Sequence, residues 1–142
     1  MRKIQSYLFL LACLTTGWIA AQELVSSAPE NADVYFIEPT DGAQVASTFT
    51  IKFGLRGMGI APAGVNVENT GHHHLLVDFD GELDMTQPLP ASDQVRHFGK
   101  GQTETEITLP AGEHQLQLVL GNYLHIPHEP AVMSYVITVM VK

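Results

Sequence analysis

Seven histidines are the residues of this sequence whose type and spacing could do chemistry. Most of them fall in two short groups, the run His72–His74 and the pair His125 and His128 in HIPHE. Neutral imidazole is the commonest protein ligand for zinc and copper. Which rings could share one metal ion depends on how the chain folds around them.

The run GHHHLLVDFD (71–80) is typical of a β-strand, and strand geometry divides its three histidines between two faces. Side chains alternate along a strand, so positions i and i+2 share a face about 6.6 Å apart. His72 and His74 therefore form a pair that could chelate one ion. His73 faces the other way, among apolar residues, and is predicted to be buried and hydrogen-bonded. Asp78 lies farther along and is better placed to orient a histidine than to bind the ion.

The second group lies in a loop that two prolines, Pro127 and Pro130, restrict to a limited set of conformations. Two imidazoles from the strand and two from this loop would make a four-ligand site for a Cu or Zn ion. The predicted metal ligands are His72, His74, His125 and His128, with His97 in RHFGKG as the reserve ligand. Binding is expected to weaken below about pH 6, because free imidazole protonates near pH 6.5.

Two other functions are compatible with the same residues. In the first, the protein is a metal-free module that binds a ligand or another periplasmic protein through the Gly-rich loop 56–71 and the loop around HIPHEP. In the second, it is a metal-dependent enzyme with an open coordination position, and Asp78 or Glu129 serves as the base. The sequence specifies no substrate and identifies no catalytic residue. The metal-binding hypothesis, with a role in buffering or delivery, therefore leads.

Short apolar runs separated by Gly, Pro and Asp must position these histidines, and no segment has a helical stripe. Residues 80–102 are predicted to be turns with at most one short strand. This spacing favours an all-β fold, an immunoglobulin-like antiparallel β-sandwich with Greek-key connections. The predicted strands are 34–38, 48–55, 72–79, 103–109, 113–121 and 133–141. The last strand is expected to turn one set of side chains to the core, namely Met133, Tyr135, Ile137, Val139 and Val141.

LPAGEHQLQL (109–118) resembles the corner before the penultimate strand of many sandwich domains, where a tyrosine hydroxyl bonds back to the backbone. His114 stands where that tyrosine would be. It is in phase with Leu116 and Leu118, so it should point toward the core. His114 is therefore predicted to satisfy a backbone group rather than to bind a metal.

The first 21 residues have the layout of a secretory signal peptide: a basic start at Arg2 and Lys3, an apolar stretch, and small residues at Ala20 and Ala21. Cleavage is predicted after Ala21, followed by a flexible lead-in (22–33) and a single domain (34–142). The protein is then periplasmic or secreted. An alternative is lipidation at Cys13, because LLAC resembles a lipobox. The stretch is too short for a stable membrane span.

The composition restricts the possible partners. Cys13 is the only cysteine, so a mature domain without the leader has no disulfide and no thiolate ligand, and a metal must use other side chains. The formal net charge is −8, and loss of Arg2 and Lys3 makes it more negative. Nucleic acid and anionic membranes are poor partners for such a surface, whereas cations are good ones.

Several stretches together resemble a bacterial exported family, domain of unknown function 4399. They are FIEPTDGAQV, FGLRGMGIAPAG, GHHHLLVD, HFGKGQTETEITLPAGEHQLQLVLGNYLHIPH and YVITVMV. The resemblance spans nearly all of residues 34–142, and GHHHLLVD and LGNYLHIPH are its most specific parts. Many members have Asp where this chain has Asn122, which weakens a carboxylate role at that position. The resemblance implies one periplasmic domain and groups the histidines, but it implies no established activity.

Overall fold

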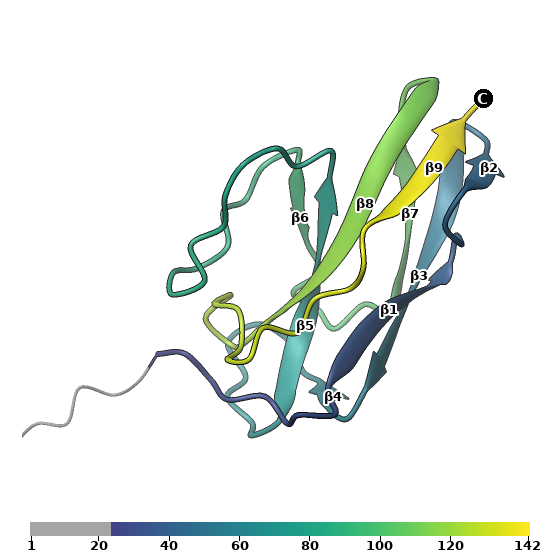
Figure 1. Ribbon diagram of the computed structural model, residues 1–142. Coiled ribbons are helices and arrows are strands. Elements are labelled where there is room, and N and C mark those ends of the chain that lie inside the picture. The colour runs from purple at the N-terminus through teal and green to yellow at the C-terminus, as the bar shows by residue number, and fades with distance from the viewer. Residues whose placement is uncertain (1–23) are drawn as a thin grey trace, which may run out of the picture.

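The computed structural model describes residues 24–142 (Figure 1), so the predicted signal peptide (1–21) lies outside the described residues. Within the described range the chain forms nine β-strands and no helix. It follows that this part of the chain holds no helix able to cross a membrane. The strands are β1 (Asp33–Glu38), β2 (Ala43–Val45), β3 (Thr48–Arg56), β4 (Gly59–Ile60), β5 (Thr70–Val77), β6 (Val95–His97), β7 (Glu104–Thr108), β8 (Gly112–Gly121) and β9 (Ile137–Val141).

The strands form two sheets that pack face to face, which confirms the predicted all-β sandwich. One sheet has three strands in the order β1-β3-β7, and the other has six, in the order β2-β9-β8-β5-β4 with β6 also paired to β5. The long ladders are antiparallel, whereas the short pairs β2–β9 and β4–β5 are parallel. The core between the sheets follows the alternation of the sequence: Phe49, Ile51 and Phe53 of β3 are all buried.

β5 is the central strand that positions the histidine run. It pairs with β8 on one side and with β6 and β4 on the other, and every residue from Gly71 to Val77 is buried. Its core-facing residues, Leu75 and Val77 among them, belong to the main core. Leu76 belongs instead to a second apolar cluster with Leu89, Val95 and Val119. The face of β5 that points away from the other sheet is therefore covered too.

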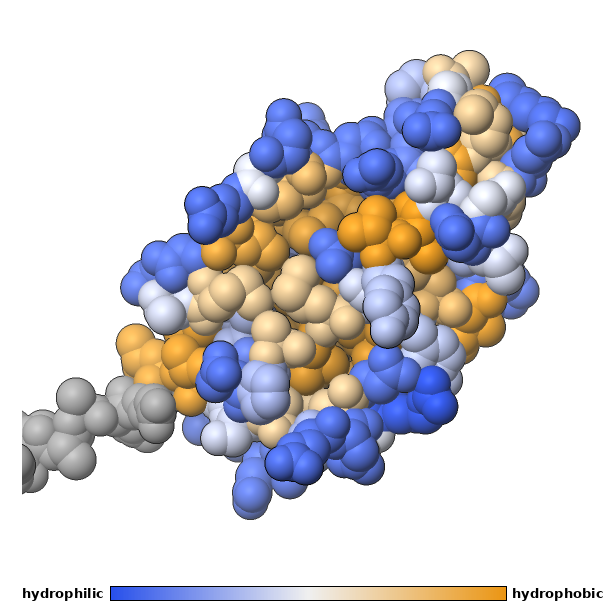
Figure 2. All heavy atoms as spheres, in the orientation of Figure 1, coloured by the Kyte–Doolittle hydropathy of each residue, from blue (hydrophilic) through white to orange (hydrophobic). Residues whose placement is uncertain are grey.

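Two long segments cover this outer face. Figure 1 shows the segment between β5 and β6 and the loop after β8 on the same side of the molecule, and the Leu89 N–H donates to the His125 carbonyl at 2.9 Å between them. Figure 2 shows apolar side chains gathered in the middle of the visible face, with polar side chains around its rim. The outer face is thus a covered layer in which polar side chains can be buried.

The last strand differs from its prediction at its start. Ile137, Val139 and Val141 are buried as expected, but Tyr135 is 94% exposed and β9 begins only at Ile137. The Ser134 hydroxyl accepts from the Leu118 N–H at 2.9 Å and donates to the Tyr135 carbonyl at 2.8 Å. These bonds make Ser134 the buried residue, so the alternation is reset before β9. The predicted inward positions of Met133 and Tyr135 are wrong, and Met133 packs against the outer cluster instead.

Candidate metal centre

Four histidines from three parts of the chain meet on the outer face of the six-stranded sheet: His72 and His74 of β5, His97 at the end of β6, and His125 in the loop after β8. Each offers one ring nitrogen, and these four atoms all lie within 4.8 Å of one another. Tetrahedral coordination with bonds of about 2.0–2.1 Å needs nitrogens roughly 3.3 Å apart. Small ring movements would therefore close this histidine group on one ion.

β5 holds the two most deeply buried members of the group. His72 and His74 are 0% and 1% exposed, and their ring centroids are 4.8 Å apart, as expected for alternate residues of one strand. Gly121 of β8 lies opposite His72 in the ladder. A Cβ at Gly121 would lie 2.7 Å from Cε1 of His74, so a glycine is needed there to make room for the ring.

β6 brings in His97, which pairs directly with His74 in the antiparallel ladder. The centroid of its ring lies 4.9 Å from that of His72 and 4.5 Å from that of His125. A side chain at Gly99 would collide with the His97 ring, so the glycine in FGKG leaves space for this ring. His97 is the exposed member of the group and connects the site with solvent.

The loop after β8 supplies His125 through a tight turn. His125 has a φ of 68°, in the left-handed region that residues other than glycine seldom occupy. Nδ1 of His125 and Nε2 of His72 are 3.1 Å apart and share a hydrogen bond. The turn thus places the fourth imidazole directly against the strand pair.

The nitrogens of this site are poorly satisfied by protein alone. Nδ1 of His72 and Nδ1 of His74 are buried and have no hydrogen-bond partner among the described residues. An unpaired buried polar atom costs free energy, so native proteins hold few of them unless a bound species explains them. The histidine group has no carboxylate member. This donor set fits a transition metal, which takes neutral imidazole nitrogens, and does not fit Ca²⁺ or Mg²⁺.

The surroundings of His72, His74 and His97 favour the neutral form of each ring. Burial, with smaller contributions from the neighbouring histidines, lowers the pKa of His72 to about 4 and that of His74 to about 3. Burial and the nearby His125 also lower the pKa of His97. The lone pairs of these rings are therefore available to a cation well below neutral pH. The expected weakening of binding below about pH 6 accordingly shifts to more acidic pH at His72 and His74.

His128, which the sequence placed among the ligands, is not part of the histidine group. Its ring nitrogens face two backbone carbonyls, Leu120 O at 3.3 Å and Thr70 O at 3.2 Å, and the residue is 2% exposed. Pro127 forms an isolated bridge with Gly121, so the loop has already turned back toward β8 before it reaches His128. His128 thus cross-links β5 and β8, while His97, named only as a reserve, lies in the group.

His73 points to the other side of β5, as strand alternation predicts. It is 1% exposed, and its ring centroid lies 5.0 Å from that of Phe53. Neither ring nitrogen has a hydrogen-bond partner within the described part of the chain, so the expected hydrogen bonds are not present. Burial lowers its pKa to about 4.

His114 forms a separate site in β8, at the corner where this strand begins. Its Nε2 donates to the Pro110 carbonyl at 2.9 Å, which is the backbone contact expected for a corner residue. Its Nδ1 lies 2.6 Å from Oδ2 of Asp78. Asp78 has a φ of 48° and follows the end of β5, so its side chain leaves the face of His72 and His74. The hydrogen bond that the His114 ring donates to Asp78 is the main reason that the pKa of His114 is raised.

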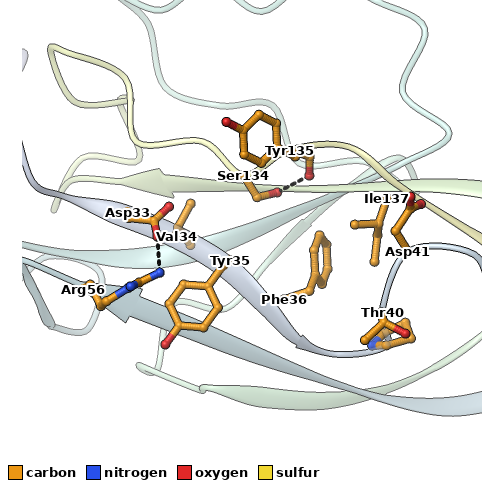
Figure 3. Close-up of a pocket in the computed structure, with 11 residues that line it drawn as sticks. Asp33, Val34, Tyr35, Phe36, Thr40, Asp41, Arg56, Ser134, Tyr135 and Ile137 are labelled. Atoms are coloured by element: carbon orange, nitrogen blue, oxygen red, sulfur yellow. Dashed lines mark hydrogen bonds and ion pairs between the residues drawn. The ribbon is translucent and has the colours of Figure 1, made fainter.

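A cavity of about 400 Å³ lies away from the histidine group, between β1 and the segment before β9 (Figure 3). Tyr35, Phe36 and Ile137 line it, and an ion pair of 2.7 Å between Arg56 and Asp33 lies at its border. None of the four clustered histidines lines this cavity. The histidine group and this cavity are thus separate features of the sandwich.

The fold and site together define an all-β sandwich with a four-histidine group on its outer face. The chain belongs to the family described as "Domain of unknown function (DUF4399)", whose model matches residues 51–142. No curated protein is significantly similar to this chain.

Among solved structures, the chain is similar to one described as "X-ray structure of the endo-beta-1,4-mannanase from Thermotoga petrophila". The identity is 19% and the TM-score is 0.46, over 78% of this chain and 20% of that chain. This chain thus spans about a fifth of the length of the mannanase chain. A similarity this low assigns no function.

Proposed function

We propose that this protein binds one Cu or Zn ion through His72, His74, His97 and His125, and that it buffers or delivers the ion. The observation that carries the proposal is the convergence of four imidazole nitrogens within 4.8 Å. These residues come from three separate segments, so their meeting requires the tertiary fold. The acidic chain, with a formal net charge of −8, attracts cations toward the site.

A metal ion accounts for features that a metal-free binding module leaves unexplained. Without an ion, Nδ1 of His74 stays buried and unpaired within the described structure, and Nε2 of His72 has only Nδ1 of His125 as its partner. An unpaired buried polar atom costs about 1–3 kcal/mol. A bound ion would accept a lone pair from each ring and hold the neutral imidazoles together. The free energy of metal binding would then offset the cost of burying these rings.

The ligand count favours storage or delivery over catalysis. Four protein ligands fill a tetrahedral shell, whereas catalytic zinc sites keep three ligands and leave one position for water or substrate. The exposed His97 gives the ion a route to solvent or to an acceptor. Export is a further part of the proposal, supported by the signal-like layout of residues 1–21 and by a domain whose metal site needs no cysteine.

The test is titration of purified, untagged protein with Zn²⁺ and Cu²⁺ in competition with a chelator. The double variant His72→Ala/His74→Ala should bind at least about 100-fold more weakly, because even outer-shell partners of a metal site are worth 10–100-fold. His114→Gln removes a histidine outside the group and should keep the wild-type affinity. Equal affinity of the double variant and the wild type would overturn the assignment. Elemental analysis without metal, together with no thermal shift on adding either ion, would favour the metal-free module.

A further inference from the structure

One buried side chain, Asn122, builds the turn that presents His125. Asn122 is 1% exposed, and its Oδ1 accepts hydrogen bonds from the N–H groups of Leu124 at 2.8 Å and Ile126 at 3.1 Å. Its backbone N–H donates to the Ile126 carbonyl at 2.8 Å, and its carbonyl accepts from the His125 N–H at 2.8 Å. These four bonds close residues 122–126 into one compact turn.

The backbone of His125 depends on that turn. A φ of 68° is unfavourable for a residue with a Cβ, and such a conformation persists only where its surroundings fix it. The hydrogen bond from the Leu89 N–H to the His125 carbonyl adds a second restraint. If the turn opened, His125 would relax to an ordinary conformation and its ring would move away from His72.

The other end of the Asn122 side chain reaches the start of the described chain. Its Nδ2 donates to the Leu24 carbonyl at 2.8 Å and to Oγ of Ser26 at 3.1 Å. The Glu129 N–H donates to the Ser26 carbonyl, and the Ala28 N–H donates to the Glu129 carbonyl, both at 3.0 Å. Residues 24–28, here called the N-terminal strap, therefore lie beside the metal-binding loop rather than forming a free lead-in.

Hydrogen bonds account for much of the attachment of the strap. Leu24 is 54% exposed and Ser27 is also exposed, whereas Ala28 packs against the core. A segment with so little apolar burial is held weakly and can open without global unfolding. The strap begins close to the cleavage site predicted after Ala21, where proteins of the export compartment could reach it.

We propose that Asn122 is a positioning residue for the metal site and that the N-terminal strap controls metal release through it. This inference rests on the proposed function. With the strap docked, both ends of the Asn122 side chain are fixed and the turn holds His125 against the strand pair. With the strap displaced, the turn loosens, His125 leaves, and the ion keeps only three ligands. An acceptor that takes up the strap would thus lower the affinity at the moment of transfer.

The variant Asn122→Asp tests the link without removing the turn. A carboxylate still accepts from the N–H groups of Leu124 and Ile126, but it cannot donate to the strap. We expect Zn²⁺ and Cu²⁺ to bind about 10-fold more weakly and to leave faster, the size typical for outer-shell partners. This direction is diagnostic, because an added negative charge by itself would strengthen cation binding.

Asn66→Asp is the matched control for charge. Asn66 is exposed and lies in the same surface hollow as Ser26 and His128, so the variant adds the same charge nearby without altering the turn. It should bind metal at least as tightly as the wild type. Ile137→Val controls for a general loss of stability, since Ile137 is a core residue of β9. It should leave both affinity and release rate unchanged.

Ala28→Pro weakens the strap from its other end, because proline cannot donate to the Glu129 carbonyl. It should reproduce the weaker metal binding and faster metal release of Asn122→Asp. In both variants the Cu²⁺ spectrum should show one nitrogen ligand fewer than in the wild type. Wild-type affinity and release rate in both Asn122→Asp and Ala28→Pro would overturn this inference while leaving the metal site intact. Absence of binding in the wild type itself would overturn the proposed function and this inference with it.

Discussion

The histidine group on the outer face and His114 at the corner show two opposite uses of the same side chain. In the group, His72 and His74 lie among other imidazoles, and burial lowers their pKa values to about 4 and 3. At the corner, His114 lies between the Asp78 carboxylate and the Pro110 carbonyl, and hydrogen bonding to Asp78 raises its pKa. His72, His74 and His114 are all buried, so burial alone does not decide the charge of a ring.

The difference lies in what surrounds the ring nitrogens. His114 has an acceptor at each nitrogen, which the protonated ring satisfies by donating twice. His72 and His74 have buried nitrogens with no partner in the described structure, and protonation there would add an unpaired charge. The surroundings of His114 therefore favour its protonated form, whereas the histidine group presents neutral rings whose lone pairs suit a metal ion.

The largest expected effect concerns the stability of the metal-free protein in acid. The folded pKa values of His72, His73 and His74 lie below 6.5, so below pH 6.5 the unfolded chain binds protons that the folded chain does not. The contribution of these neutral histidines to the free energy of unfolding is fully present above pH 6.5 and decreases as the pH falls toward about 4. Each pKa unit corresponds to about 1.4 kcal/mol, so the loss should reach several kcal/mol. Urea unfolding across this pH range measures it.

The variant His74→Leu sharpens that result. Leucine does not titrate, so the variant should lose less stability than the wild type between pH 6.5 and pH 4. An equal pH dependence in both proteins would contradict the lowered pKa of His74. Bound Zn²⁺ should stabilise the wild type above pH 6.5 and have little effect on the variant.

A smaller effect is expected for His73→Leu. Both ring nitrogens of His73 are buried without partners in the described chain, and the ring packs on Phe53. Removing them should increase the free energy of unfolding at pH 7 by about 1–2 kcal/mol, and by more at pH 5. Metal affinity should not change, because His73 faces the core while His72 and His74 face outward. A loss of metal binding would show that His73 belongs to the site.

The smallest effect is expected for Asp78→Asn. The amide oxygen can keep the hydrogen bond from the Gln115 N–H, which is 2.8 Å long in the wild type, but the charge beside His114 is lost. The pKa of His114 is higher in the folded chain than in the unfolded chain, so its interaction with Asp78 stabilises the fold below pH 6.5. This stabilisation is lost as the pH rises through the folded pKa of His114. Asp78 is 44% exposed, so the loss at pH 6 should be only about 1 kcal/mol.

Chemical denaturation of wild type and Asp78→Asn at pH 6 and pH 9 measures this difference, which should shrink at the higher pH. A difference that grows with pH would contradict the raised pKa of His114. Metal affinity should be the same in both proteins, since Asp78 lies outside the histidine group.

Alternation along a strand was enough to predict several parts of the structure. The buried set of β3, the inward His73 and the shared face of His72 and His74 all follow from a period of two. The same reasoning failed at Tyr135, because bonds through the Ser134 hydroxyl reset the phase before β9. Strand alternation therefore predicts which side chains face the core only while the pairing of that strand with its neighbour is uninterrupted.

Long-range pairing limited the prediction of the site. β6 has only three residues, too few to show a pattern, and nothing local indicates that His97 pairs with His74. HIPHE shows two histidines three positions apart, but not that the chain turns back between them. The local sequence therefore predicts His128 and His125 equally as ligands, whereas the ring of His128 contacts the carbonyls of Leu120 and Thr70.

The sequence by itself determined the class of fold and the division of GHHHLLVD between two faces, because both depend on local backbone geometry. The tertiary structure decided which histidines meet. The ladder between β5 and β6 brings His97 beside His74, and the turn around Asn122 holds His125 in a left-handed conformation. The ladder joins residues far apart in the chain, and the Leu89 N–H, which donates to the His125 carbonyl, attaches the local turn to a distant segment, so both contacts exist only after the chain has folded.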